Sequence, residues 1–177
     1  MKIAVAITWI PFWLYWLAAA TGAKQSTVRR RRLPVTGLSI VAVVVLVRVF
    51  RGGSLAVHDP VLGAIGVAVF AAGLALAIWS RVHLGRNWGM PMTERIEPEL
   101  VTSGPYRLVR NPIYTGLLLG VLGTALVTNL FGLIVVALLA GCFYWSATTE
   151  ERNLARAFPD SYPAYQARTK MFLPFIL

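Results

Sequence analysis

Apolar residues are concentrated in about five long runs, which are separated by polar segments. The runs are residues 3–20, 33–50, 61–80, 113–128 and 130–147. The last three carry no charged residue, and they approach or reach the length that crosses a hydrocarbon core of about 30 Å. Arg48 lies near the end of the second run, where a long side chain can extend to the interface. This pattern predicts an all-α fold, a polytopic membrane bundle of about five transmembrane helices.

The first run has two features of a signal peptide. Lys2 precedes it, and the small residues Ala18, Ala19 and Ala20 end it. Its length and its aromatic residues are instead typical of a transmembrane helix with interfacial anchors. We therefore expect a helix that is retained.

The net charge of +10 suggests a nucleic-acid ligand, but the positions of the cations suggest membrane topology. Most cations fall into three segments: Lys24 and Arg29 to Arg32; Arg81, Arg86, Arg95, Arg107 and Arg110; and Arg152, Arg156, Arg168 and Lys170. Under the positive-inside rule these segments are cytoplasmic. The sequence predicts a multi-pass protein of a bacterial inner membrane, with its N-terminus outside and its C-terminus in the cytoplasm. The cations are expected to contact membrane lipids and no nucleic acid.

Residues 104–116 form the segment in which turn formers, cations and aromatic residues occur together. Gly104-Pro105 and Asn111-Pro112 are turn or boundary dipeptides, because proline fixes its own φ and moves the preceding residue out of the α region. Between and beside them lie Tyr106, Arg107, Arg110 and Tyr114. A segment of this kind at the mouth of a membrane helix favours a binding site over a simple linker.

The fourth and fifth runs are separated by a two-residue turn at Thr128-Asn129. So short a turn predicts an antiparallel helical hairpin, which returns Glu150 and Glu151 to the side of residues 104–116. We expect an amphipathic helix to begin near Thr148 and to end at Pro159. Adjacent carboxylates on a helix point about 100° apart, so one faces inward and the other faces water. They are either a favourable charge at a helix N-terminus or a ligand for a bound cation.

The remaining cytoplasmic segments leave alternatives open. His83, Arg86, Asn87 and Trp88 follow the third run, and they are either interfacial anchors or donors to a lipid or cofactor. Residues 90–103 are expected to be a loop. The apolar end 171–177 is too short to span a membrane and is expected to pack on the bundle or enter lipid.

Several familiar chemistries lack their motifs. The sequence has no Gly-rich phosphate loop, dinucleotide fingerprint, nucleophile triad or metal-ligand spacing. Cys142 is the only cysteine, so neither an intrachain disulfide nor a cysteine metal site can form. His58 is a lone histidine in a turn and is expected to be solvated. The pattern favours a cytoplasmic pocket in which a small charged cofactor meets an apolar substrate from the bilayer.

Three parts of the chain resemble the isoprenylcysteine carboxyl methyltransferase family and its bacterial and phospholipid methyltransferase relatives. They are Leu100-Val101-Thr102-Ser103-Gly104-Pro105-Tyr106; Arg110-Asn111-Pro112-Ile113-Tyr114-Thr115-Gly116; and Glu150-Glu151 with the closing stretch from Tyr165 to Pro174. The resemblance covers the chain from about residue 80. It implies one membrane domain, with residues 1–80 as scaffold and 81–177 as the catalytic half.

The resemblance also implies methyl transfer from S-adenosylmethionine to a lipophilic, membrane-dissolved lipid or isoprenoid-type substrate. The implied cofactor-binding residues are Leu100, Val101, Tyr106, Arg110, Asn111, Pro112, Ile113, Tyr114, Gly116 and Glu150. The cofactor carries a sulfonium, an ammonium and a carboxylate, which suit Glu150 and either Arg107 or Arg110. Glu151 and His83 are candidate bases for an amine substrate, and Arg168 is a candidate holder of an anionic one.

Two positions depart from the family pattern. Asn111 stands where many members have histidine, and Ser146 stands where the prenylcysteine enzymes have an arginine for the substrate carboxylate. The methyl acceptor is therefore open between a carboxylate and an amine. Two other functions stay as alternatives: an NADPH-dependent enzyme similar to sterol reductases, and a non-enzymatic helical scaffold.

Overall fold

The structure, a computed structural model, describes residues 1–20, 26–27, 53, 55–85, 94–95 and 99–173. Its helices are α1 (Lys2–Ala20), α3 (Pro60–Leu84), α4 (Pro112–Thr128), α5 (Gly132–Ala157) and α6 (Tyr162–Arg168), with a 3₁₀ turn η2 at Gly104–Arg107. A two-residue strand β1 (Ser26–Thr27) pairs antiparallel with β2 (Glu94–Arg95). Apart from this short pair, the described fold is helical, as the apolar runs predict.

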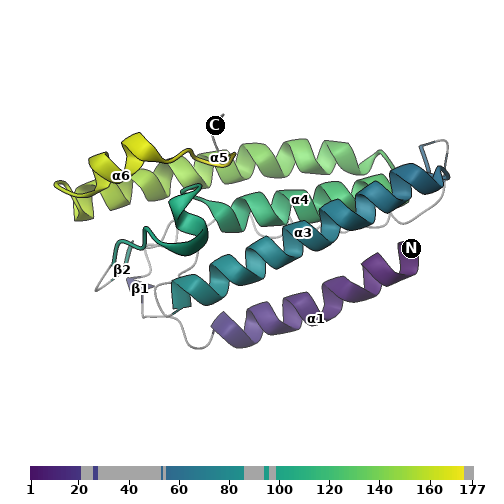
Figure 1. The fold of residues 1–177 in the computed structure, drawn as a ribbon, viewed down its shortest axis with the longest axis horizontal. Coiled ribbons are helices and arrows are strands. Elements are labelled where there is room, and N and C mark those ends of the chain that lie inside the picture. Colours follow the sequence, from purple (N-terminus) through teal and green to yellow (C-terminus); the bar gives the residue numbers. More distant parts are fainter. Residues whose placement is uncertain (21–25, 28–52, 54, 86–93, 96–98, 174–177) are drawn as a thin grey trace.

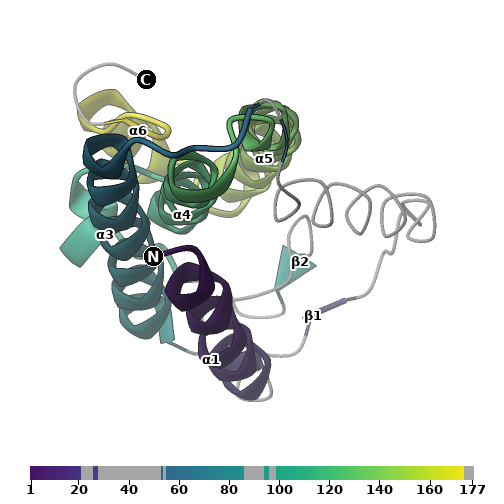
Figure 2. The same ribbon diagram turned by 90° about the vertical axis from the view of Figure 1, so that its right-hand side faces the viewer.

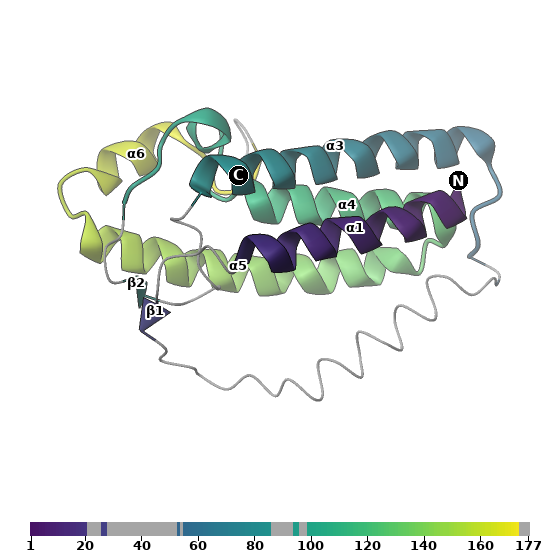
Figure 3. The ribbon, with the colours of Figure 1, turned by 90° about the horizontal axis from the view of Figure 1, so that it is seen from below.

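The long helices lie roughly side by side, with α4 between α3 and α5 (Figures 1 and 2). Helix α1 lies along α3 and α4 (Figure 3). Because α4 runs opposite to the other three, its first turn lies at the same end of the bundle as the C-terminal ends of α1, α3 and α5 (Figure 1). We call this the site end.

Four of the predicted spans are helices here, and the predicted span 33–50 lies outside the described residues. Helices α1, α3 and α5 are each long and apolar enough to cross a membrane, and α4 is a shorter apolar helix of 17 residues. Large apolar side chains such as Ile10 of α1 and Leu138 of α5 point outward. A helical bundle with this surface is integrated in a membrane.

One predicted boundary is wrong. No new helix begins near Thr148, because α5 continues without a break from Gly132 to Ala157. Glu150 and Glu151 therefore lie about two turns before the C-terminal end of a 26-residue helix. The interpretation of this pair as charges at a helix N-terminus is excluded, so other groups must stabilise them. The predicted end is right, since α5 stops just before Pro159.

The ends of α3 and the start of α4 follow local sequence signals. Asp59 caps α3 by accepting hydrogen bonds from the backbone N–H groups of Val61 and Leu62, and Pro60 occupies the first turn. Pro112 takes the corresponding position in α4. Proline fits there because its missing N–H would have no partner inside the helix.

Helices α3 and α4 approach closely along a line of glycines, which we call the glycine seam: Gly66 and Gly73 of α3 with Gly116, Gly120 and Gly123 of α4. A Cβ atom on Gly73 would lie 2.5 Å from the backbone nitrogen of Gly120 and 2.6 Å from the carbonyl oxygen of Gly116. Small residues of this kind let membrane helices pack backbone to backbone. The seam fixes the position of α4 against α3.

Helix α1 joins this pair through aromatic side chains. Phe12 and Trp16 are buried in a core cluster with Phe70 and Leu74 of α3. The indole N–H of Trp9 donates to Thr124 Oγ1 at 3.1 Å, which satisfies a polar group inside the bundle. The scaffold that carries the first turn of α4 is thus packed on two sides.

Candidate functional site

At the site end, the first turn of α4 faces the last turns of α5. The hydroxyl of Tyr114 donates to Glu150 Oε1 at 2.6 Å. The ring of Tyr114 stacks on Phe143, which lies two turns earlier on α5, with a centroid separation of 4.7 Å. The predicted return of the hairpin to residues 104–116 is therefore confirmed. A half-buried carboxylate at the edge of an apolar bundle is held by a directional bond.

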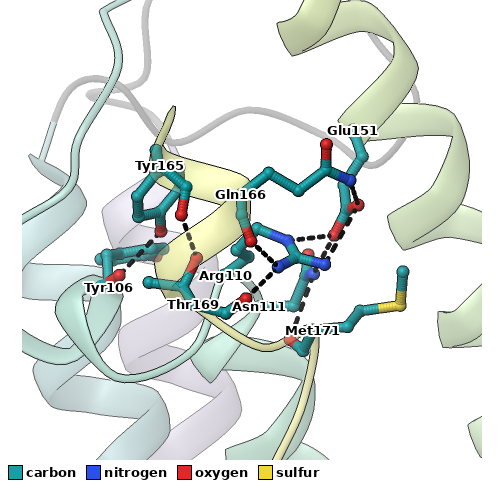
Figure 4. Close-up of polar contacts among 8 residues, drawn as sticks. All are labelled: Tyr106, Arg110, Asn111, Glu151, Tyr165, Gln166, Thr169 and Met171. Atoms are coloured by element: carbon teal, nitrogen blue, oxygen red, sulfur yellow. Dashed lines mark hydrogen bonds and ion pairs between the residues drawn. The ribbon is translucent and has the colours of Figure 1, made fainter. Parts of the chain in front are cut away.

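Glu151, the adjacent carboxylate, is turned to a different set of partners (Figure 4). Arg110 donates through Nε to Glu151 Oε1 at 2.8 Å and through Nη2 to Oε2 at 3.4 Å. Asn111 Nδ2 lies 3.4 Å from Oε1, and Gln166 Nε2 lies 3.3 Å from Oε2. Glu151 is 8% exposed, so this pair with arginine compensates a carboxylate that is removed from water.

The prediction that the two carboxylates point apart is confirmed, but neither simply faces water. Glu150 faces Tyr114, while Glu151 is the more buried of the two. Residues 110–114 supply Tyr114 to Glu150, and they supply Arg110 and Asn111 to Glu151, which also binds Gln166 of α6.

The segment after α6 lies along this turn. The backbone N–H groups of Arg110 and Asn111 donate to the carbonyl oxygens of Lys170 and Met171, at 2.8 and 3.1 Å. Thr115 Oγ1 donates to the carbonyl of Phe172 at 2.9 Å. Arg110 Nη1 also donates to the carbonyls of Gln166 and Thr169. We call this set the tail clasp: Arg110, Asn111, Thr115, Glu151 and Gln166 with the carbonyls of residues 169–172.

Two tyrosines of α6 pack beside the tail clasp. The hydroxyl of Tyr165 donates to the backbone carbonyl of Tyr106 in η2 at 2.7 Å (Figure 4). Burial raises the pKa of Tyr165 to about 12. Burial and then the charge of the nearby Glu151 raise the pKa of Tyr162 as well, although its hydroxyl makes no hydrogen bond of normal geometry within the described residues.

His83, at the end of α3, contacts the start of the turn-rich segment. Its Nε2 lies 2.9 Å from Ser103 Oγ. A Cβ atom on Gly104 would lie 2.7 to 2.8 Å from the His83 ring, and Gly104 has a φ of +58°. Glycine therefore suits this position both for its backbone conformation and for the space beside the imidazole.

The other predicted site residues lie in different surroundings. Leu100 and Val101 are half-buried in the stretch before η2, and Tyr106 is buried within η2 itself. Pro112 is fully buried, whereas Ile113 packs on the aromatic core and Gly116 faces α3 in the glycine seam. Arg168 is exposed at the end of α6. The residues 86–93 fall outside the described part of the chain, so the donors expected at Arg86 and Asn87 stay predictions.

Sequence reasoning missed the second half of the tail clasp. Gln166 and Thr169 lie in the closing stretch of the family resemblance, but no role was predicted for them, and the acceptors in residues 169–172 are backbone carbonyls. A carbonyl acceptor has no residue-type signature, so no motif would have indicated it.

Arg110 is a predicted partner of the cofactor carboxylate, whereas its guanidinium here binds Glu151 and two carbonyls. The roles predicted for Leu100, His83, Arg168 and the other site residues stay predictions.

Comparison with known proteins places the chain among membrane methyltransferases. A model of the phospholipid methyltransferase family matches residues 61–161. The chain is 38% identical over 82 residues to the protein-S-isoprenylcysteine O-methyltransferase of Schizosaccharomyces pombe, which covers 44% of this chain and 34% of that protein.

Two bacterial relatives have names that refer to metal resistance. The cobalt-zinc-cadmium resistance protein CzcN of Cupriavidus metallidurans is 40% identical over 98 residues, or 54% of this chain and 45% of that protein. The nickel-cobalt-cadmium resistance protein NccN of Alcaligenes xylosoxydans xylosoxydans is 30% identical over 159 residues, or 88% of this chain and 70% of that protein. The chain thus spans less than half of the first relative but most of the second. The family match covers more than half of the sequence and includes both the turn at residues 110–114 and the carboxylates on α5, so the chain belongs to the phospholipid methyltransferase family.

Proposed function

We propose that this protein transfers a methyl group from S-adenosylmethionine to a lipid or isoprenoid-type acceptor dissolved in the membrane. The observation that carries the proposal is the Glu150 carboxylate, which the Tyr114 hydroxyl holds at 2.6 Å beside the first turn of α4. Family membership supports methyl transfer as the reaction class.

The residues present suit the charges of this cofactor. The sulfonium and ammonium groups are cations, and a half-buried carboxylate in a low-dielectric site attracts a cation more strongly than one in water. The cofactor's own carboxylate requires a donor. Because Arg110 already binds Glu151, the exposed Arg107 of η2 is the better candidate of the two arginines.

When bound, the cofactor supplies an electrophilic methyl group, and the acceptor's lone pair forms the new bond while the carbon–sulfur pair stays on sulfur. The protein needs no covalent intermediate for such a direct transfer. Its contribution is orientation of the reacting atoms, which can account for a large part of the barrier reduction. Tyr114, held by Phe143 on its face and Glu150 at its hydroxyl, is suited to this positioning role.

The arrangement also supports the predicted topology. Apart from Lys2 at the start of α1, the exposed arginines and lysines of the described residues gather at the site end, on η2, the last turns of α5, α6 and the tail: Arg107, Arg152, Arg156, Arg168 and Lys170. Asp59 lies at the opposite end of α3. We propose that the site end is cytoplasmic in a bacterial inner membrane and that the N-terminus is outside, following the positive-inside rule. An apolar acceptor then reaches the site from the bilayer, and the soluble cofactor reaches it from the cytoplasm.

Calorimetric titration of the detergent-purified protein tests the cofactor assignment. We expect S-adenosylhomocysteine to bind and NADPH not to bind. Glu150→Ala should abolish measurable binding, while Asp160→Asn, which changes an exposed carboxylate in the turn after α5, should leave it unchanged. Binding of NADPH without S-adenosylhomocysteine would support the reductase alternative, and binding of neither would support the scaffold.

Transfer of radiolabelled methyl groups into a total lipid extract addresses the acceptor. Release of the label as volatile methanol in mild base would indicate a methyl ester, and label that stays in a non-volatile product would indicate an N-methyl group. The names of the two metal-resistance relatives specify no reaction and therefore no acceptor. The assay determines the class of acceptor directly.

A further inference from the structure

We propose that Glu151 is a positioning residue that, with Arg110 and the tail clasp, fixes the turn at residues 110–114 for cofactor binding. The inference rests on the proposed function and deepens it. It replaces the role of proton acceptor that the sequence alone suggested for Glu151. The reasons are the occupancy of its oxygens, the attachment of the tail and the unusual use of Asn111.

The oxygens of Glu151 are already surrounded by donors. An ionised carboxylate offers about four lone-pair sites. Four donor contacts reach Glu151: Arg110 Nε and Asn111 Nδ2 at Oε1, and Arg110 Nη2 and Gln166 Nε2 at Oε2. A general base needs an accessible lone pair within reach of the proton that it removes. Glu151 is buried behind protein donors and offers no such position.

The tail attaches to the same turn through its backbone. Three successive carbonyls, those of Lys170, Met171 and Phe172, accept hydrogen bonds from Arg110, Asn111 and Thr115. Because these acceptors belong to the main chain, the tail and the turn are held in a fixed register, as in a short parallel bridge between Val109 and Lys170. Arg110 connects this bridge to α5 through Glu151.

Asn111 shows that the turn is held from outside the helix. Asparagine at the residue before a helix usually accepts a hydrogen bond from the first helical N–H groups. Here Asn111 makes no such cap. Its amide group lies 3.4 Å from Glu151 Oε1 and 3.3 Å from the Met171 carbonyl. The start of α4 is therefore oriented by α5 and the tail rather than by its own cap.

The consequence concerns Tyr114. The glycine seam fixes the body of α4, while the tail clasp fixes the turn that leads into it. Tyr114 lies four residues after Arg110, in the first turn of α4, and donates to Glu150. Loss of the Arg110–Glu151 pair should therefore weaken cofactor binding without removing any group that transfers a proton.

The test compares Glu151→Gln, Arg110→Gln and the double variant in lipid nanodiscs. For each, the dissociation constant of S-adenosylhomocysteine is measured by calorimetry, and the rate at saturating S-adenosylmethionine is measured as a function of pH. We expect each single variant to weaken binding by about tenfold or more, because each leaves a buried charged group without its partner. The double variant should lose less than the product of the two single effects. The saturated rate should fall less than the affinity, and its pH profile should keep its shape, because no group that transfers a proton is lost.

Unchanged affinity in Glu151→Gln, with a large loss of rate and loss of the ionisation on the acidic side of the pH profile, would overturn the inference and restore Glu151 as a base. The wild-type titration separates this from failure of the proposed function. If wild-type protein binds no S-adenosylhomocysteine, both fail. If it binds and the variants bind equally well, the inference alone fails.

A second pair of variants covers the case in which a charge variant does not fold. Thr115→Val removes the hydrogen bond to the Phe172 carbonyl, and Thr128→Val is its matched control on the same helix. Thr128 is also buried and donates only to the carbonyl four residues earlier, at the other end of α4. We expect weaker S-adenosylhomocysteine binding in Thr115→Val than in Thr128→Val. Equal affinity in the two variants would contradict the role of the tail clasp.

Discussion

The glycine seam and the tail clasp hold two parts of α4 by opposite means. Along its length, α4 packs on α3 through the glycine seam, where backbone meets backbone without polar side chains. At its first turn, the tail clasp surrounds a buried ion pair with amides and carbonyls. The seam depends on the absence of side chains, and the clasp depends on directional bonds.

The seam and the clasp therefore fix different quantities, the distance between two helices and the orientation of a turn. Close packing fixes the distance between two helices but is satisfied by any residue small enough to fit. A charged pair with its hydrogen bonds fixes orientation, and losing one partner is costly because the other is left buried. Substitutions in the seam should therefore reduce folding, while substitutions in the clasp and its neighbours should change the site before they abolish the fold.

The largest effect is expected in the seam. In Gly73→Ala the new Cβ would lie 2.5 Å from the Gly120 nitrogen, so the two backbones must separate. We expect a loss of about 1–3 kcal/mol or more of stability, seen as a lower melting temperature in detergent or as aggregated protein.

Gly141→Ala is the matched control for that substitution. Gly141 lies in α5, and a Cβ atom there would meet nothing from the rest of the fold within 4 Å, while alanine favours a helix by up to about 1 kcal/mol. Its melting temperature should stay the same or rise. Equal destabilisation of the two variants would show that the seam contact is not the cause.

A smaller effect is expected beside the clasp. Tyr165→Phe removes the donor to the buried Tyr106 carbonyl, which should cost about 1–2 kcal/mol. Tyr162→Phe removes a hydroxyl that makes no hydrogen bond of normal geometry within the described residues and should be close to neutral. Thermal unfolding of the two variants in the same detergent tests this order, and the reverse order would contradict it.

The ionisation of Tyr165 should have the smallest effect on stability near neutral pH, because it lowers the free energy of unfolding only in alkali. Its pKa is about 12 in the folded protein and about 10 when unfolded. A pKa raised by folding gives stability that is full below about pH 10 and is lost as pH rises through about 12. The stability difference between wild type and Tyr165→Phe should therefore shrink between about pH 10 and 12, as measured by unfolding at each pH. A constant difference would exclude this linkage.

Much of the helical scaffold was predictable from the sequence. Uncharged runs of membrane-spanning length predicted the positions of α3, α4 and α5, and a short turn predicted the hairpin that returns α5 to the site. The turn consists of residues 129–131 rather than Thr128-Asn129, because Thr128 is the last residue of α4. The error at Thr148 has a physical origin. Polar residues after an apolar run end a membrane span, but they need not end a helix whose backbone bonds continue into water.

The site was predictable as a location but less so in its pairings. Tyr114 and Glu150 were expected near one another, and they are bonded. Arg110 was expected to meet a cofactor, and it meets Glu151 instead, because charge type alone does not specify which partner a side chain selects. The carbonyl acceptors of the tail depend on the path of the backbone, so no pattern of residue types could have indicated them.

The most direct test is a double-mutant cycle on Tyr114 and Glu150, with S-adenosylhomocysteine affinity as the readout. If this pair forms the cofactor site, Tyr114→Phe and Glu150→Gln should each weaken binding by roughly 10- to 100-fold, since each removes a hydrogen bond to or from a charged group. Because the two groups bond to each other, the double variant should lose less than the product of the single effects. Wild-type affinity in Glu150→Gln would contradict the assignment of this carboxylate to the ammonium group, which is the cation that S-adenosylhomocysteine shares with the cofactor.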